Sequence, residues 1–133
     1  MGHGFTLKCK TCDFEQRMLL GVGIQQMQAN FALLEEMRDG LHGAIFAEKA
    51  DAEGAEAELS RELVVCPACG AFEVVDGLSL YITNDELDRE VLAESEHRCS
   101  RCEAVMERTA GYRDLRCPHC RGELQASGMI LWD

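Results

Sequence analysis

Every cysteine in this 133-residue chain belongs to one of four Cys-x-x-Cys pairs. In chain order the pairs are Cys9 and Cys12, Cys66 and Cys69, Cys99 and Cys102, and Cys117 and Cys120. A two-residue spacer folds into a tight turn, or knuckle, that directs both sulfurs at one ion, and two knuckles complete a tetrahedral shell of four thiolates. The eight cysteines therefore predict two metal sites, with two Zn²⁺ ions as the expected cofactors and iron as the less favoured metal.

The length of the chain makes these ions important for folding. Either half of 133 residues is too small to bury a large hydrophobic core. A structural zinc site contributes about 10–16 kcal/mol of folding free energy. That is comparable to the whole stability of an ordinary domain, about 5–15 kcal/mol. We therefore expect the fold to be lost when the metal is removed.

The formal net charge of −11 is concentrated in the middle of the chain. Residues 1–34 and 97–133 each carry +1, whereas residues 35–62 carry −6 and residues 63–96 carry −7. An acidic centre disfavours binding to nucleic-acid phosphates and to anionic membranes. No stretch reaches the roughly 18 apolar residues of a membrane span, and no secretion signal is visible at the N-terminus. We expect a cytoplasmic protein, where cysteine pairs are metal ligands more often than disulfides.

Around the first knuckle, residues 4–8 and 14–20 alternate as strands of a hairpin do. Helical periodicity then begins, with apolar residues at steps of three and four. These residues are Ile24, Met27, Phe31, Leu34 and Met37. We expect this stripe to pack on the sheets, with a partner-binding face as the alternative. The following residues 47–60, rich in alanine and acid, suit a solvated helix or a linker.

Further along, residues 62–65 predict a strand that enters the second knuckle. Asp76-Gly77 predicts a two-residue turn between strands at 71–75 and 78–82. The capping-box pattern at residues 83–86 predicts a short helix to about Glu94, with Leu87 and Val91 turned inward.

The spacing of the knuckles bears on which of them share an ion. Fourteen residues separate Cys102 from Cys117, close to the spacing that four-cysteine zinc sites use. This favours the third knuckle with the fourth, and leaves the first knuckle to join the second. An interleaved arrangement, with the second knuckle joined to the third, remains open.

The expected fold is α+β, with two small antiparallel zinc ribbons. Residues 1–82 would form the N-terminal ribbon with a helical insertion at about 24–60. Residues 83–96 would form a short helical connector, and residues 97–133 the C-terminal ribbon.

Several short motifs resemble those of a group of uncharacterised bacterial proteins that carry two zinc ribbons. They are Leu20-Gly21-Val22-Gly23 after the first knuckle, Gly70 and then Leu80-Tyr81-Ile82 after the second, and Ile130-Leu131-Trp132-Asp133 at the end. The resemblance implies a double-ribbon fold and no particular activity. Knuckles in such ribbons usually have glycine after the second cysteine, and Asp13, Glu103 and Arg121 depart from this.

The saturated thiolate shells favour a non-enzymatic, zinc-binding adaptor that mediates protein interactions, because four cysteines leave no coordination position for substrate. No catalytic residues are predicted. A first alternative is nucleic-acid binding through the C-terminal arginines, with Tyr112 or Trp132 stacking on a base. These arginines are Arg98, Arg101, Arg108, Arg113, Arg116 and Arg121.

Redox chemistry is a further alternative, in two forms. The first two knuckles together resemble the iron site of rubredoxins, which are electron carriers. The long insertion and the aromatic content of only 6% favour zinc instead. Cys117-Pro118-His119-Cys120 also resembles the active-site tetrapeptide of thiol–disulfide oxidoreductases, which need a reactive thiol, typically at a helix N-terminus. His97 and His119 are possible substitute ligands that eight cysteines make unnecessary.

Overall fold

The computed structural model describes residues 2–109 and 111–133, which form two compact units. Unit 1 contains the segments up to Gly21, Arg61–Val75 and Glu96–Asp133, and unit 2 contains Val22–Ser60 and Asp76–Ser95. Each unit is therefore assembled from separate parts of the chain. This division differs from the expected succession of 1–82, 83–96 and 97–133, because two long strands each continue from one unit into the other.

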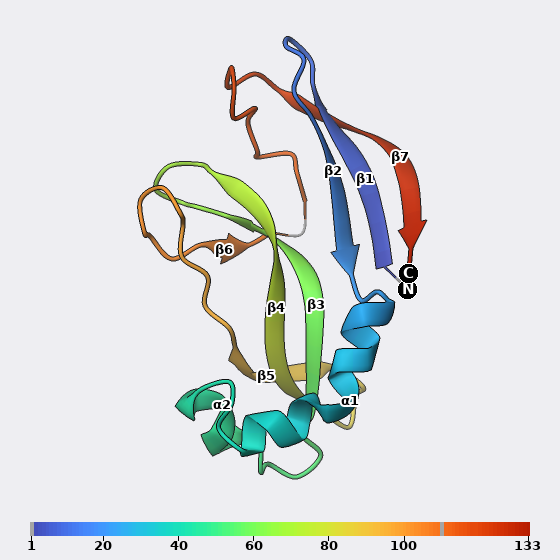
Figure 1. Cartoon of the computed structure of the whole chain (residues 1–133), viewed down its shortest axis with the longest axis vertical. Coiled ribbons are helices and arrows are strands. Elements are labelled where there is room, and N and C mark those ends of the chain that lie inside the picture. The colour runs from blue at the N-terminus through green and yellow to red at the C-terminus, as the bar shows by residue number, and fades with distance from the viewer. Residues whose placement is uncertain (1, 110) are drawn as a thin grey trace. The chain divides into compact units, whose positions relative to one another are not determined.

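In unit 1, the first and last strands of the chain lie side by side. Strand β1 (Gly2–Cys9) pairs antiparallel with β2 (Glu15–Gly21) on one edge and with β7 (Leu124–Trp132) on the other, as Figure 1 shows. The hairpin predicted around the first knuckle is confirmed. The β1–β7 pairing, which joins the two ends of the chain, was not predicted.

The second knuckle lies between β3 (Glu56–Val65) and β4 (Phe72–Thr83), the two strands that run through both units. The short strand β6 (Glu107–Arg108) pairs with the end of β3, where Arg108 also forms an ion pair with Glu62 at 2.7 Å. Two buried clusters fill unit 1. One contains Leu7, Met18, Leu63, Leu115 and Leu124 with Cys9 and Cys117, and the other contains Val64, Cys66, Cys99 and Met106.

Unit 2 contains both helices, α1 (Ile24–Arg38) and α2 (Ala44–Lys49), with β5 (Arg89–Glu94) paired to β4. Its core is made of Leu33, Met37, Phe46, Ala50, Ala55, Leu80 and Ala93. The mixture of antiparallel sheet and a few helices confirms the α+β class. Among the described residues, no helix combines the length and apolarity needed to cross a bilayer.

Two predictions between residues 71 and 94 are wrong. The first is the turn at Asp76-Gly77, because β4 continues through these residues without interruption. The second is the helix from residue 83, because Asn84 closes a turn there instead. Its Oδ1 accepts hydrogen bonds from the backbone N–H groups of Glu86 and Asp88, which is a turn-forming use of the same side-chain chemistry.

The predicted apolar stripe of α1 faces the core only at its C-terminal end, where Met37 is buried and Leu34 packs against the core of unit 2. Phe31 is 86% exposed, and Ile24 and Met27 are about half exposed. The helix begins at Ile24 and ends at Arg38, as the sequence indicated, but it buries a different row. Only Met37 of the predicted stripe is fully buried, next to Leu33 of the buried row.

Candidate metal centres

The structure gathers all eight predicted cysteines into two groups of four, both in unit 1. The first group joins the first and fourth knuckles, and the second group joins the second and third. Within each group, all four sulfur atoms lie within 4.8 Å of one another. The favoured pairing of neighbouring knuckles is therefore wrong, and the interleaved arrangement is the one found.

The first group follows from the β1–β7 pairing. The first knuckle extends from the end of β1, and the fourth knuckle directly precedes β7. Cys9 lies opposite Leu124 in the sheet, and the N–H of Lys10 donates to the carbonyl of Glu123 at 3.0 Å. The two knuckles thus meet at the same end of the two strands.

The second group follows from the pairing of β6 with β3. Val64 and Val65 of β3, just before the second knuckle, lie opposite Arg108 and Glu107. The chain of the third knuckle leads into β6 and is held there by this pairing. The sequence spacing between the third and fourth knuckles contains no trace of either strand pairing, and for this reason it pointed to the wrong partners.

The distances between sulfurs suit a tetrahedral metal ion. Sγ of Cys9 lies 3.4 Å from Sγ of Cys120, and Sγ of Cys12 lies 3.5 Å from Sγ of Cys117. In the second group the corresponding distances are 3.4 Å for Cys66 to Cys102 and 3.6 Å for Cys69 to Cys99. A tetrahedral site with metal–sulfur bonds of about 2.3 Å separates its sulfurs by about 3.8 Å. All eight cysteines are free thiols, so the donor set fits one four-thiolate ion in each group.

Three of the four knuckles share one backbone geometry. In each, the residue after the second cysteine has a positive φ, and its N–H donates to the carbonyl of the first cysteine. Gly70 adopts this conformation without strain, but Glu103 and Arg121 also adopt it, with φ of 64° and 63°. The absence of glycine therefore does not alter the knuckle, but it leaves two residues in a strained conformation.

Backbone N–H groups point at the buried sulfurs and stabilise their thiolates. The hydroxyl of Thr11, with the N–H groups of Thr11 and Cys12, lowers the pKa of Cys9 to about 6. The N–H of Cys69, 3.4 Å away, is the main cause that lowers the pKa of Cys66 to about 6. Each group therefore contains at least one thiol whose pKa lies near neutral pH, and the pKa values of Cys120 and Cys99 are lowered as well.

Other cysteines of each group, Cys12 in the first and Cys69 and Cys102 in the second, shift in the opposite direction. For Cys12 the N–H of Phe14 lowers the pKa, but burial and the hydrogen bonds with neighbouring sulfurs outweigh it and raise the pKa to about 12. For Cys102 the N–H of Ala104 is likewise outweighed, chiefly by the contact with Cys66, and the pKa rises to about 12. Like charges in a small space oppose ionisation of all four thiols unless a cation is bound.

The histidines proposed as substitute ligands belong to neither group of sulfurs in the described chain. The ring of His119 stands edge-on to Phe14, with centroids 5.3 Å apart. The tetrapeptide Cys117–Cys120 lies in a turn between Arg116 and Glu123, which form an isolated β-bridge, and not at a helix N-terminus. This placement argues against the oxidoreductase interpretation.

The structure separates the C-terminal arginines into different surroundings. Arg98 pairs with Glu96 at 3.1 Å and Arg108 pairs with Glu62. Trp132 is engaged, because its Nε1–H lies 3.0 Å from the carbonyl oxygen of His3 and 3.1 Å from that of Leu20. Tyr112 packs against Phe5, with ring centroids 5.7 Å apart. Tyr112 nevertheless lines a small cavity of about 300 Å³ together with Arg113 and Arg116, so it lies beside two of the predicted arginines, whereas the indole N–H of Trp132 is taken up by backbone carbonyls.

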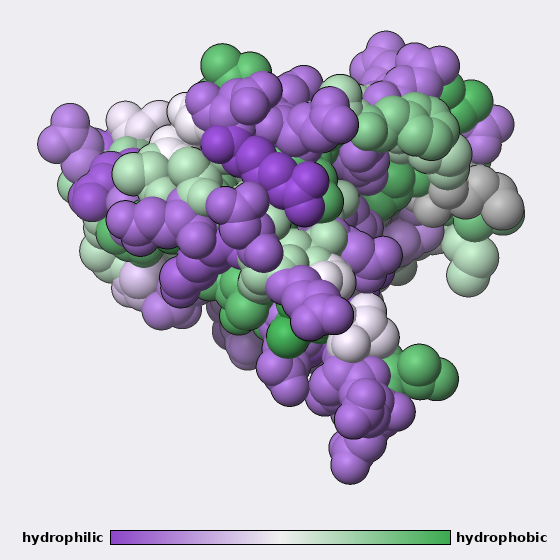
Figure 2. Space-filling model, turned by 90° about the horizontal axis from the view of Figure 1, so that it is seen from below, coloured by the Kyte–Doolittle hydropathy of each residue, from purple (hydrophilic) through white to green (hydrophobic). Residues whose placement is uncertain are grey.

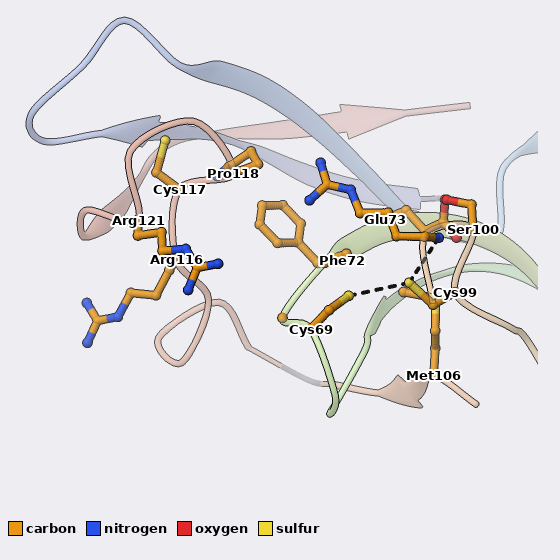
Figure 3. A pocket seen from close by; sticks show the side chains of 13 residues that line it. Cys69, Phe72, Glu73, Cys99, Ser100, Met106, Arg116, Cys117, Pro118 and Arg121 are labelled. Carbon is orange, nitrogen blue, oxygen red and sulfur yellow. Dashed lines mark hydrogen bonds between the residues drawn. The ribbon is translucent and has the colours of Figure 1, made fainter. Parts of the chain in front are cut away.

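Three arginines do share one cavity of about 380 Å³ between the knuckles of unit 1. Arg101, Arg116 and Arg121 line it together with Phe72, an aromatic residue that the sequence did not single out. Figure 3 shows the ring of Phe72 between Cys69 on one side and Pro118 on the other. Glu73 adds one acidic side chain to the lining.

Comparison with known proteins found no relative, since no family model, no curated protein and no solved structure matches the chain. The resemblance to bacterial double zinc-ribbon proteins is supported only by the two four-cysteine groups and otherwise stays a prediction. The fold and the site therefore define a protein with two candidate four-thiolate metal centres in one compact unit.

Proposed function

We propose that this protein is a non-enzymatic zinc protein in which two structural Zn²⁺ ions hold together a module for protein interactions. The observation that carries the proposal is the grouping of all eight cysteines into two sets of four, each with sulfurs at tetrahedral distances. The cysteines in contact are 105 to 111 residues apart in the first group and 30 to 36 in the second. Each ion would therefore connect segments that are distant in the chain.

A structural role is favoured over a catalytic one by the composition of the shell. Four thiolates occupy every position of a tetrahedral ion, whereas a catalytic zinc keeps one position for water or substrate. Cys9 and Cys117 in the first group, and Cys66 and Cys99 in the second, are also part of the hydrophobic clusters of unit 1. Metal binding and core packing would thus stabilise the same unit.

Elemental analysis of protein purified without chelator tests this proposal, with zinc and iron measured on the same sample. We expect two zinc ions per chain and a colourless protein. A value well below two metals would refute the two-site proposal. Iron in place of zinc, with a coloured protein, would favour an electron carrier built on the two groups found, and not on the first and second knuckles together as the rubredoxin resemblance implied. Chelation should then abolish the cooperative thermal unfolding transition of unit 1.

A second candidate function, binding of single-stranded nucleic acid, is favoured by the arginine-lined cavity. Guanidinium groups neutralise phosphates and an aromatic ring can stack on a base. The net charge of −11 does not repel nucleic acid from unit 1, because this unit has ten basic and ten acidic side chains and is formally neutral. In this function Phe72 takes the stacking role.

An ionic-strength series with a labelled single-stranded oligonucleotide tests this candidate. The change Arg101→Ala with Phe72→Ala should weaken binding and reduce its salt dependence, while Arg17→Ala, an exposed arginine outside the cavity, serves as the control. Binding without salt dependence, or equal losses in all variants, would exclude the candidate.

A further inference from the structure

Helix α1 carries polar residues on part of its buried side and apolar residues on its exposed side. Its inward row, at steps of four, three and four, consists of Gln26, Asn30, Leu33 and Met37. The side-chain oxygens of the two polar residues accept hydrogen bonds from backbone N–H groups of unit 2. Oε1 of Gln26 accepts the N–H of Gly23 at 3.1 Å, and Oδ1 of Asn30 accepts the N–H of Leu59 at 2.7 Å.

The opposite row of α1 is apolar and exposed to solvent. Ile24, Met27 and Phe31 follow one another at steps of three and four, which places them on one face, and they are 49%, 48% and 86% exposed. Glu35, four residues further on, ends the row with an exposed acid. We call these four residues the α1 face. A surface helix normally places its apolar row inward, so this arrangement is the reverse of the one that folding alone favours.

Exposed apolar side chains are concentrated in the same unit. Among the described residues, seven of the ten large hydrophobic side chains that are exposed belong to unit 2. Besides the three on α1 they are Leu41, Ile45, Leu87 and Val91. Figure 2, which views the molecule from below relative to Figure 1, shows apolar side chains exposed among hydrophilic ones on that face. Exposed apolar surface rimmed by polar groups is typical of an interaction site.

The charge of unit 2 indicates what kind of partner this surface can accept. Unit 2 has three basic and fourteen acidic side chains, so the entire formal charge of −11 resides there. All three basic groups are engaged within the unit. Arg89 pairs with Glu58 at 2.5 Å, Arg38 lies 3.7 Å from Asp51, and Lys49 donates to the carbonyl of Leu92 at 2.9 Å.

From this combination we infer that the α1 face binds a basic, amphipathic segment of a partner protein. The apolar side of the segment covers Ile24, Met27 and Phe31, and its lysines or arginines lie against the acids of unit 2. Complementary charge steers association and selects against other partners. A second copy of the chain is disfavoured as the partner, because it would bring together two copies of unit 2, each with a formal charge of −11. An anionic membrane is disfavoured because it would be repelled by the same charge. The inference rests on the proposed function and names its partner chemistry.

The test uses the metal-loaded, full-length protein and a labelled helical peptide of leucine and lysine with one apolar face. Two control peptides accompany it, one with the same residues in an order that forms no apolar face, and one with glutamate in place of lysine. Binding is followed by fluorescence anisotropy. We expect the amphipathic lysine peptide to bind more tightly than both controls, and more weakly as salt is raised.

Variants of the protein locate the binding site. Phe31→Ala combined with Met27→Ala should weaken binding about tenfold or more, since central apolar contacts dominate such interfaces. Met129→Ala, on β7 of unit 1, is the matched control because Met129 is 84% exposed, and it should leave binding unchanged. Glu35→Lys, which removes no apolar contact, should also weaken binding of the lysine peptide. These side chains are exposed, so thermal unfolding should be unaffected.

Each of the following four outcomes would overturn the inference. The first is equal binding of the lysine peptide by the wild type and by the double variant Phe31→Ala with Met27→Ala. Another is a dimer, detected by sedimentation, that these substitutions dissociate, since a second copy would then occupy the face. The third is binding to zwitterionic lipid vesicles that the same substitutions abolish. If wild-type protein holds two metals but ignores the peptide, the inference fails while the structural zinc proposal stands.

Discussion

At the scale of single residues, the cysteines differ in their protonation before any metal binds. The pKa values of about 6 for Cys9 and Cys66 lie below the ordinary value of 9.0, and those of about 12 for Cys12 and Cys102 lie above it. A lowered pKa favours the folded arrangement of the thiols fully above pH 9, and this contribution is lost as the pH falls through about 6. A fall in pH through about 6 therefore protonates Cys9 and Cys66, which are also expected metal ligands.

Metal binding at pH 8 should release protons, because a thiol must ionise to become a ligand. Cys12 and Cys102 are protonated at this pH, so we expect at least one proton per site. Calorimetric titration with Zn²⁺ in buffers of different ionisation enthalpy measures this number directly. Binding heats that do not depend on the buffer would contradict the prediction.

The strained residue Glu103 gives a second prediction. Its φ of 64° places its backbone in the left-handed region, which costs about 1–2 kcal/mol for a residue other than glycine. The change Glu103→Gly removes this strain but makes the unfolded chain more flexible, so we expect a net gain of up to about 1 kcal/mol. Asp13→Gly is the control, because Asp13 is not among the described residues with positive φ, and it should destabilise. Thermal unfolding of the metal-loaded variants measures both.

At the scale of the elements, local pattern determined where helices and strands begin and not which side they bury. The start of α1 at Ile24 and its end at Arg38 could be predicted, because glycines and Arg38-Asp39-Gly40 mark them. Its orientation could not, because apolar residues lie on both sides of the helix. Only packing against Phe46 and Leu80 in the core of unit 2 selects Leu33 and Met37 for burial.

The pairing of β1 with β2 depends on a glycine at position 4. A β-carbon added there would lie 2.4 Å from the carbonyl oxygen of Met18 in the neighbouring strand. Gly4→Ala must therefore push the two strands apart, and we expect a loss of about 1–3 kcal/mol. Gly111→Ala is the matched control, since a β-carbon there meets no atom within 4 Å. Equal thermal stabilities of the two variants would show that the strands yield without cost.

At the scale of the whole molecule, the interleaved knuckles make a prediction that separates the two possible pairings. Cys12 and Cys120 belong to one group, whereas Cys69 belongs to the other. The double change Cys12→Ser with Cys120→Ser should therefore remove one metal per chain, and Cys12→Ser with Cys69→Ser should remove both. Pairing of sequential knuckles would reverse these results. Metal analysis of the two double variants, both carrying two serines, decides between them.

The sequence by itself determined the local chemistry of this protein. Four knuckles with two-residue spacers establish eight thiol donors, and alternating or helical periodicity establishes most of the elements that carry them. The tertiary structure decided which knuckles meet. That choice depends on β1 with β7, and on β3 with β6, pairings between segments far apart in the chain. Hydrogen bonds between distant strands leave no spacing or period in the sequence, so the two metal groups are visible only once the sheet has formed.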